Sequence, residues 1–471
     1  MVQFPQAKSL WHHLTLASLS GAAGSADRLW QSTYLARIGG LLSGWQQENW
    51  LLRQAGAIAV GLVLLLFIAA PFVSTTIIGL LLLGCCAVWV LLALQDRFII
   101  TPIHGVVLVY WGISTVATAF SPVRAEALDG WLKLTLYIVL FALLARLLRS
   151  PRTRSATIMV YLLTALTVAA AGLRQWFFGA DALATWVDPD SALAGTTRVY
   201  SYLGNPNLLA GYLIPAVFLS GAALLAWRGL GKLLAATILL VTTACLVLTF
   251  SRGGWIGFVA GSFIFLGLLV HGLSVRLPQP WRRWALPGLL AATAASLTVA
   301  VSAIAPLRDR VATIFSGRED SSNNFRINVW AAVIEMIKAR PVLGIGPGND
   351  AFNQVYPFYQ EPGYTALSAY SVFLEISVET GIIGLVCFLW LLVVAFSCGW
   401  RSLQRLRQGR ESSWLWLIAA MAAITGMLAH GLVDTVWYRP QVSILWWLML
   451  ALVASFDRLA VTPESSSAAS E

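Results

Sequence analysis

The chain contains 471 residues, of which 58% are hydrophobic and only 11% are charged. A soluble protein of this length needs far more charge to cover its surface, so the composition indicates a polytopic membrane protein. The net charge of +10 comes from short basic clusters between apolar runs, a pattern typical of membrane topology that argues against a nucleic-acid partner. The cysteines all lie in apolar segments, so we expect packed thiols, no metal site, no disulfide framework and no cofactor.

Residues 1–53 are mixed and polar, unlike a cleaved signal peptide, and are predicted to form a cytoplasmic N-terminal segment. A helix needs about 20 apolar residues to cross the hydrocarbon of a bilayer. This length predicts an all-α protein with about 12 transmembrane helices, nine in residues 54–305 and three in residues 370–457. Residues 458–471 are rich in Ser, Ala and Glu and are predicted to be a disordered cytoplasmic tail. The predicted spans lie near residues 55–73, 75–94, 100–120, 130–148, 157–178, 203–226, 231–250, 254–273, 284–305, 370–397, 414–436 and 441–457.

The distribution of basic residues predicts how these spans are oriented. With the N-terminus in the cytoplasm, nineteen of the 31 Lys and Arg residues fall on the inner side. Six fall in short outer loops and outer helix ends, and the other six fall in one long outer loop. We therefore expect a multi-pass protein of the cell (inner or plasma) membrane with both termini cytoplasmic and the long loop periplasmic.

Residues 306–369 form this long loop, between the ninth and tenth spans. Long loops that are neither charged runs nor low-complexity tend to be functional. Apolar residues at helical spacing predict an amphipathic helix over residues 323–340 within the loop. Ser322 or Asn323 is the expected N-cap, and Pro341 is expected to end the helix.

A glycine-rich stretch, RPVLGIGPGND at residues 340–350, follows the predicted loop helix. It lacks the Gly-Lys-Ser/Thr of a Walker loop, and no strand precedes it, so it is neither a nucleotide loop nor a dinucleotide fingerprint. Gly344, Gly346 and Gly348 can supply the positive φ of a tight turn that leads the chain back to the membrane. Their backbone N–H groups could also form an anion-binding nest.

Polar residues gather near the predicted outer surface of the membrane. Ionisable groups at membrane depth cost roughly 2.5–3.5 kcal/mol each on insertion scales, which makes them functional candidates. Three arginines from distant parts of the chain would together form an outward-facing pocket that attracts anions. The candidates for anion or pyrophosphate binding are Arg198, Arg252 and Arg326, with Asn205 and Asn207 beside them; the catalytic candidates are His430, Asp434 and Glu375, and Glu379 shares a helix face with Glu375.

Each candidate also has a structural alternative. Arg198 and Arg252 can reach lipid phosphates, and the two glutamates can pair with arginines as a structural lock. His430 and Asp434, four residues apart, can form a buried hydrogen-bonded pair. The convergence of all these groups on one face of the membrane is a stronger signal than any one of them.

Five motifs in chain order resemble the O-antigen ligase/polymerase superfamily. They are GNPN at 204–207, SRGG at 251–254, an arginine with Trp330 on the loop helix, RPVLGIGPGND at 340–350, and FLEISVETGIIG at 373–384. The resemblance covers roughly residues 55–457. Within the superfamily the chain looks most like the cyanobacterial bicarbonate-transporter family, which implies a role in inorganic-carbon accumulation.

Ligases of this superfamily are metal-independent membrane glycosyltransferases that act on the periplasmic side. They move a glycan from an undecaprenyl-pyrophosphate carrier to an acceptor such as lipid A-core. The resemblance implies that Arg198 or Arg252, together with Arg326, holds the donor pyrophosphate. It also implies a histidine base at the return from the large loop.

That histidine is absent from this chain. Where a ligase carries it, this sequence reads TALSAYS at residues 365–371, and residues 306–369 contain no histidine. A general base typically contributes about 10²–10⁴-fold to a rate, and serine or tyrosine is a poor substitute at neutral pH. Either His430 or a carboxylate such as Glu375 takes this role, or the chain does not perform ligase chemistry.

Two functions of different classes therefore remain, and whether the protein is an enzyme stays open. In the first, the protein takes part in bicarbonate accumulation and handles the anion at the arginine-rich pocket, among membrane lipids and with other membrane subunits as candidate partners. In the second, it is an O-antigen ligase-like glycosyltransferase, or a polymerase, acting on a lipid-linked glycan pyrophosphate. Loop aromatics such as Phe352 and Tyr356 would then stack on sugar rings.

Overall fold

The computed structural model describes most of the chain: residues 13–16, 50–95, 100–179, 198–274, 278–303, 305–314, 317–409 and 412–457. Within these ranges every regular element is a helix, so the predicted all-α class is confirmed. Most of the predicted N-terminal segment and all of the predicted tail lie outside the described residues.

One long helix lies at each predicted span within the described ranges. The breaks near residues 74 and 252 separate distinct helices, as predicted, and do not lie inside a single element. The long helices are α5 (Trp50–Ala69), α6 (Thr75–Gln95), α7 (Pro102–Ala119), α8 (Arg124–Leu147), α9 (Pro151–Phe178), α10 (Pro206–Ala226), α11 (Leu230–Leu248), α12 (Arg252–Leu273), α13 (Gln279–Ala303), α17 (Val372–Leu406), α18 (Trp414–His430) and α19 (Pro440–Ser455).

Within the described residues, not every predicted span coincides with a helix that has the length and hydropathy to cross a membrane. Among the described residues, eight helices meet both conditions. Helices α18 and α19 and the Arg53–Ala69 part of α5 are also apolar, over 17 residues or fewer. Helix α13, the predicted ninth span, is not among these eight. The protein is thus a polytopic membrane protein with eight candidate spans and additional shorter apolar helices.

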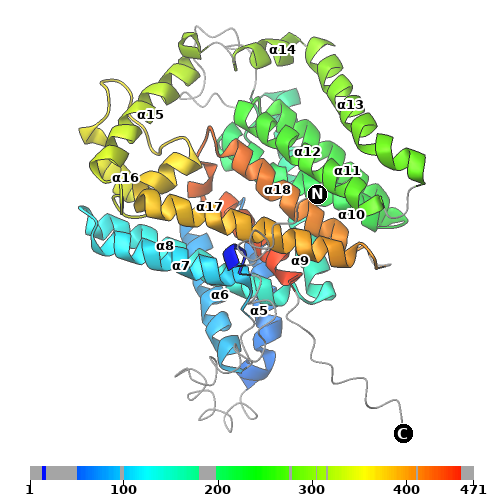
Figure 1. The fold of residues 1–471 in the computed structure, drawn as a ribbon, viewed down its shortest axis with the longest axis horizontal. Coiled ribbons are helices and arrows are strands. Elements are labelled where there is room, and N and C mark those ends of the chain that lie inside the picture. The colour runs from blue at the N-terminus through cyan, green and yellow to red at the C-terminus, as the bar shows by residue number, and fades with distance from the viewer. Residues whose placement is uncertain are drawn as a thin grey trace, which may run out of the picture.

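The core of the molecule is built around helices that are apolar on all sides. In α10, 83% of the apolar window is buried, and almost every residue of α18 and α19 is buried as well. A helix without a polar face is stable only when other helices surround it. Helix α10 packs against α11 and α18, and α18 packs against α12, so these four helices lie together in Figure 1.

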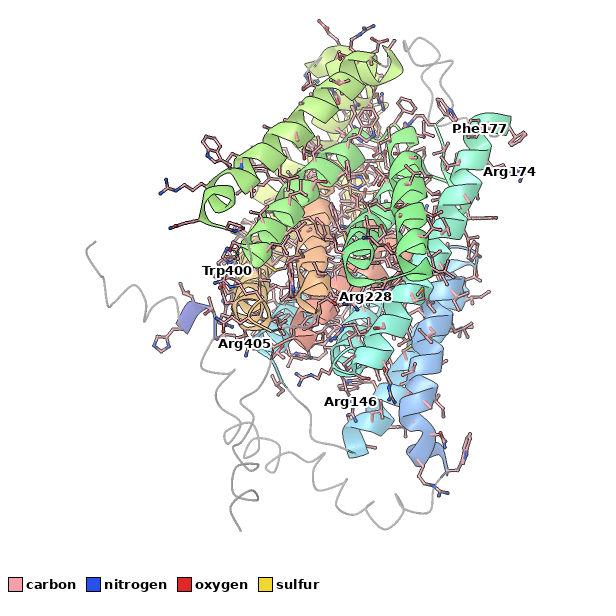
Figure 2. All side chains as sticks on the ribbon, turned by 90° about the vertical axis from the view of Figure 1, so that its right-hand side faces the viewer. Arg146, Arg174, Phe177, Arg228, Trp400 and Arg405 are labelled. Atoms are coloured by element: carbon pink, nitrogen blue, oxygen red, sulfur yellow. The ribbon has the colours of Figure 1, made fainter. Side chains whose placement is uncertain are left out.

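The two ends of the molecule differ in the residues they carry. Arg146 and Arg405, predicted to be cytoplasmic, lie toward the lower end in Figure 2. Arg174 and Phe177, predicted to lie outside, are near the upper end, where helix α15 (Ser321–Ala339) also lies. The ends are therefore separated as the sequence predicts, while the assignment of the upper end to the periplasm stays a prediction.

The predicted large loop folds into short helices with an apolar core of its own. These are α14 (Ala305–Ala312), η3 (Gly317–Glu319), α15, α16 (Asn349–Val355) and η4 (Tyr356–Phe358). Val329 and Val333 of α15 are buried in this core together with Phe352 and Tyr356. The Phe352 and Tyr356 rings stack with centroids 5.1 Å apart, so these two aromatics fill the loop core, where no sugar can reach them.

Helix α15 begins earlier than the sequence analysis predicts. Its N-cap is Asp320, whose carboxylate accepts a hydrogen bond from the backbone N–H of Asn323 over 2.9 Å. The predicted caps, Ser322 and Asn323, instead lie inside the first turn. An aspartate at this position is favoured because its charge also interacts well with the positive end of the helix dipole.

The glycine-rich stretch forms a turn that packs against helix α17. Gly344, Gly346 and Gly348 have φ values of 67°, 97° and 109°, a region where other residues are strained. The N–H of Gly346 donates to the backbone carbonyl of Glu379 over 2.9 Å, and the N–H of Gly348 donates to the Glu379 carboxylate over 2.7 Å. Because the protein itself occupies these N–H groups, the stretch leaves no open nest for a free anion.

Gly381 accommodates this packing by interrupting α17. Its φ of 66° is non-helical, and a Cβ at this position would overlap the carbonyl of Val342. The N–H of Ile382 donates to the carbonyl of Pro341 over 2.8 Å, which replaces a bond lost from the helix. The kink and the glycine-rich turn are therefore one structural unit.

Candidate functional site

Two helix N-termini meet at the end of the molecule that carries α15. The Asn205 side chain caps α10 by accepting from the N–H groups of Asn207 and Leu208, over 2.8 and 3.3 Å. The Ser251 hydroxyl caps α12 by accepting from the N–H of Gly254 over 3.2 Å. Each N-terminus carries a partial positive charge, so this point of the structure favours an anion before any side chain is considered.

The two glycines of the SRGG motif allow this close approach. A Cβ on Gly254 would lie 2.6 Å from the Cβ of Ala210 on α10, and a Cβ on Gly253 would lie 2.7 Å from Cδ2 of His430 on α18. Larger residues at either position would force α12 away from its neighbours. The glycines therefore serve packing, and the functional group of the motif is its arginine.

Arg252, the first residue of α12, joins this helix to the loop domain. Its Nη2 lies 2.8 Å from Oδ1 of Asp320, and its Nη1 donates to the backbone and hydroxyl oxygens of Thr313 over 2.9 and 3.1 Å. Arg252 and Asp320 are 7% and 13% exposed, so solvent screens this ion pair weakly. Although burial raises it, the pKa of Asp320 is held below its ordinary value by the Arg252 guanidinium.

A second network links Arg198, Asn207, Asp434 and Arg326. Nη2 of Arg198 donates to Oδ1 of Asn207 over 3.3 Å, and Nδ2 of Asn207 donates to Oδ2 of Asp434 over 2.7 Å. Nη2 of Arg326 lies 3.7 Å from the same carboxylate oxygen. The three arginines and the asparagine predicted to bind an anion are thus brought together, with Asp434 between them.

A fourth arginine, Arg310 of α14, belongs to the same cluster. Its Nε donates to the carbonyl of Phe250 over 3.2 Å, next to the carbonyl of Thr249 that accepts from Nε of Arg198 over 3.1 Å. Among the described residues, no hydrogen-bond acceptor contacts the other N–H groups of the Arg310 guanidinium. We call Arg198, Arg252, Arg310 and Arg326 the arginine cluster.

The positive charges of the arginine cluster outnumber the negative charges nearby. Four guanidinium groups face two carboxylates, those of Asp320 and Asp434, which leaves an excess of two positive charges. Burial and the neighbouring arginines lower the pKa of Arg198 to about 10 and that of Arg310 to about 9. Both groups remain protonated at neutral pH, so their mutual repulsion is relieved when an anion binds.

His430, the last residue of α18, packs against Gly253 of the SRGG motif and is fully buried. Glycines surround its ring: a Cβ on Gly211 would lie 3.6 Å from Cε1, and one on Gly257 would lie 3.2 Å from the His430 Cβ. Neither ring nitrogen has a hydrogen-bond partner among the described residues. The buried hydrogen-bonded pair of His430 with Asp434 is therefore not formed, because the Asp434 carboxylate is occupied by Asn207, the Thr435 N–H and Arg326.

The two glutamates of α17 lie outside the arginine cluster. Glu375 accepts from the N–H of Ala369 over 2.6 Å, and Glu379 accepts from the N–H of Gly348 over 2.7 Å. In the part of the chain that the structure describes, neither forms an ion pair with an arginine, so the expected structural lock is not formed. Both line a separate cavity, described below.

The segment that replaces the ligase histidine runs close to Asp434. The Ser368 hydroxyl forms a short hydrogen bond with the hydroxyl of Thr435. Tyr370, with a φ of 49°, accepts a bond from the Trp330 indole at its carbonyl over 3.4 Å. Burial, followed by the Asp434 charge, raises the pKa of Tyr370 to about 12, so this phenol can donate a hydrogen bond at neutral pH but cannot act as a base.

A comparison with protein families identifies the middle of the chain. The model of the O-antigen ligase family matches residues 235–389, a segment that contains Arg252, Arg310 and Arg326 but neither Arg198 nor Asp434. The chain is thus a polytopic membrane protein that carries an O-antigen ligase domain. No curated protein matches it. The family match gives no support to the more specific likeness to bicarbonate transporters.

Proposed function

We propose that the protein is a membrane glycosyltransferase of the O-antigen ligase type, whose donor is a glycan on a lipid-linked pyrophosphate. The observation that carries this proposal is the arginine cluster, where four guanidinium groups meet two carboxylates. A diphosphate diester carries two negative charges, which equals the excess positive charge of the cluster. Arginine also matches the geometry of phosphate oxygens and binds them through paired hydrogen bonds.

The cluster would stabilise the leaving group of the reaction. The acceptor hydroxyl oxygen attacks the anomeric carbon of the glycan, the bond from that carbon to the diphosphate oxygen breaks, and negative charge develops on the departing diphosphate. Among the described residues, Arg310 has N–H groups without an acceptor, and Nε of Arg326 is buried without a hydrogen-bond partner. Donors that are already oriented in this way stabilise developing charge without reorganisation, and each is typically worth about 10²–10³ in kcat.

We assign proton acceptance from the acceptor hydroxyl to Asp434. Of the two carboxylates at the cluster, Asp320 caps α15 and pairs with Arg252, whereas Asp434 lies between Arg326 and Asn207. His430 is enclosed by glycines and has no path to a bound substrate in the described structure. Asp434 would therefore take the role that a loop histidine has in related ligases.

The test is glycosyl transfer by the full-length protein in lipid nanodiscs. A polyprenyl-diphosphate-linked glycan is supplied with candidate acceptors, and the released polyprenyl diphosphate is measured. We expect Arg326→Ala and Asp434→Asn each to reduce kcat by at least about 10²-fold. Arg308→Ala, which removes an exposed arginine of the same loop, is the matched control and should retain activity. Release that is unchanged in Arg326→Ala would exclude the assigned site.

Bicarbonate handling is the second candidate function, because a cationic cluster suits any small anion and the segment at residues 365–371 has no histidine. Its test is uptake of labelled bicarbonate by liposomes that contain the protein. Uptake that depends on Arg198 and Arg326 would favour it. Uptake equal to that of empty vesicles would remove direct transport.

A further inference from the structure

A cavity lies between helices α6, α8, α17 and α19, and none of its lining residues belongs to the arginine cluster. It has a volume of about 640 Å³, within the range typical of ligand sites. One part of its wall is apolar and includes Leu82, Leu391 and Trp447. Helices α6, α8 and α17, which contribute to this wall, are long and apolar enough to be candidate membrane spans.

The polar part of the cavity contains the carboxylates of Glu375 and Glu379, one turn apart on α17. Each carboxylate has a hydrogen bond from one backbone N–H, given by Ala369 and Gly348 respectively. Within the described ranges neither carboxylate contacts a basic side chain. Two adjacent, partly buried carboxylates are unfavourable without a positive partner, so the site is complementary to a cation that can donate hydrogen bonds.

The basic residues of the cavity are arranged differently. Lys133 is already held by two carboxylates, those of Asp129 at 2.5 Å and Asp350 at 3.0 Å. The Arg439 guanidinium lies over the Tyr438 ring, 5.1 Å from its centroid, and pairs with no carboxylate in the described residues. The cavity therefore combines one unneutralised positive group, Arg439, with the two glutamates and an apolar wall.

We propose that this cavity binds a membrane phospholipid whose head group carries a primary ammonium. The ammonium would lie between Glu375 and Glu379, the phosphate would face Arg439, and an acyl chain would follow the wall at Leu82 and Leu391. A polyprenyl diphosphate or another purely anionic lipid is disfavoured here, because its charge would meet two carboxylates. A choline head group has the required charge but no N–H to donate, so it binds less well.

The proposal is tested by lipid retention on the intact protein. Wild-type protein is purified from membranes, delipidated, and mixed with micelles that contain phosphatidylethanolamine, phosphatidylcholine or phosphatidylglycerol. Bound lipid is then measured by native mass spectrometry, and the melting temperature is recorded in parallel. We expect phosphatidylethanolamine to bind at least tenfold more tightly than the other two lipids and to raise the melting temperature.

Variants distinguish a specific site from general lipid adhesion. The double variant E375Q/E379Q should lose the tenfold preference for phosphatidylethanolamine. Glu335→Gln, which changes an exposed glutamate on α15, is the matched control and should keep it. If the double variant fails to fold, Leu82→Trp, which fills the apolar wall, provides the second test by reducing retention of phosphatidylethanolamine. Equal retention of all three lipids by the wild type, or preferential retention of phosphatidylcholine or phosphatidylglycerol, would overturn the proposal.

Discussion

Replacing Arg310 by glutamine should stabilise the empty protein and weaken anion binding at the same time. Burial, then Arg198 and Arg252, lower the pKa of Arg310 from 12.5 to about 9. At about 1.4 kcal/mol per pKa unit, this difference sets an upper limit of roughly 5 kcal/mol on the unfavourable interaction of its charge. Partial exposure and loss of the hydrogen bond to Phe250 reduce the gain, so we expect roughly 1–2 kcal/mol.

The same substitution removes donors from a bound diphosphate. A hydrogen bond to a charged group contributes about 1.5–3 kcal/mol, so the Kd for the ligand should rise by about 10- to 150-fold. The two effects are measured on one sample: the melting temperature without ligand should rise by about 2 °C or more, and the further rise on adding polyprenyl diphosphate should be smaller than in the wild type.

The matched control is Arg308→Gln, on the same short helix. Arg308 is 61% exposed and lies 3.6 Å from Asp309, so neither the melting temperature nor the affinity should change measurably. An Arg310→Gln protein that melts lower than the wild type without ligand would refute the view that the cluster is under repulsion. A Kd equal to that of the wild type would show that Arg310 does not face the anion.

Three further predictions concern the kink, the loop cap and pH. Gly381→Ala should destabilise the protein by roughly 2 kcal/mol or more in thermal unfolding, because the φ of Gly381 is 66° and the added Cβ would overlap backbone atoms. Gly79→Ala is the control and should be neutral or stabilising, because no atom lies within 4 Å of the added Cβ. Asp320→Ala should cost about 1–3 kcal/mol by removing a helix cap and a buried ion pair, and an unchanged melting temperature would contradict this. Stabilisation by diphosphate should be constant near pH 7 and fall as pH rises through about 9 to 10, where Arg310 and Arg198 lose their protons. Because folding lowers both pKa values, the empty protein should gain stability over the same pH range. A flat pH profile of either stability would refute this prediction.

Much of the fold follows from apolar length, because backbone groups in lipid must be paired within each segment. The positions of the long helices could therefore be read from the sequence, including the separation of α11 from α12 at Ser251. The number of spans could not be read in the same way, since a helix can be apolar and buried yet shorter than a typical span, as α18 and α19 are. The length of an apolar segment predicts a helix, but it does not show which other helices surround that helix.

The candidate site was only partly predictable for a related reason. Arg198, Arg252 and Arg326 stand beside recognisable turns and motifs, so they could be singled out as candidates. Arg310 could not, because it lies in an unremarkable basic stretch, and only the path of the loop brings its Nε to the carbonyl of Phe250. Likewise, the four-residue spacing of His430 and Asp434 suggested a pair, but α18 ends at His430 and the chain then turns away.

The short segment after α18 separates two sites of opposite charge. Asp434 pairs with Arg326 of the arginine cluster. The next residue, Thr435, lines the cavity that contains Glu375 and Glu379, and it donates its N–H to the Asp434 carboxylate over 2.9 Å. A lipid-linked diphosphate and an ammonium-bearing head group would therefore be sorted by electrostatics to opposite sides of one backbone turn. The Thr435 hydroxyl also bonds to Ser368, so we expect a change at this turn to affect both sites. A Thr435→Val protein should consequently weaken diphosphate binding and phosphatidylethanolamine retention in the same preparation, and loss of only one of them would show that the two sites are independent.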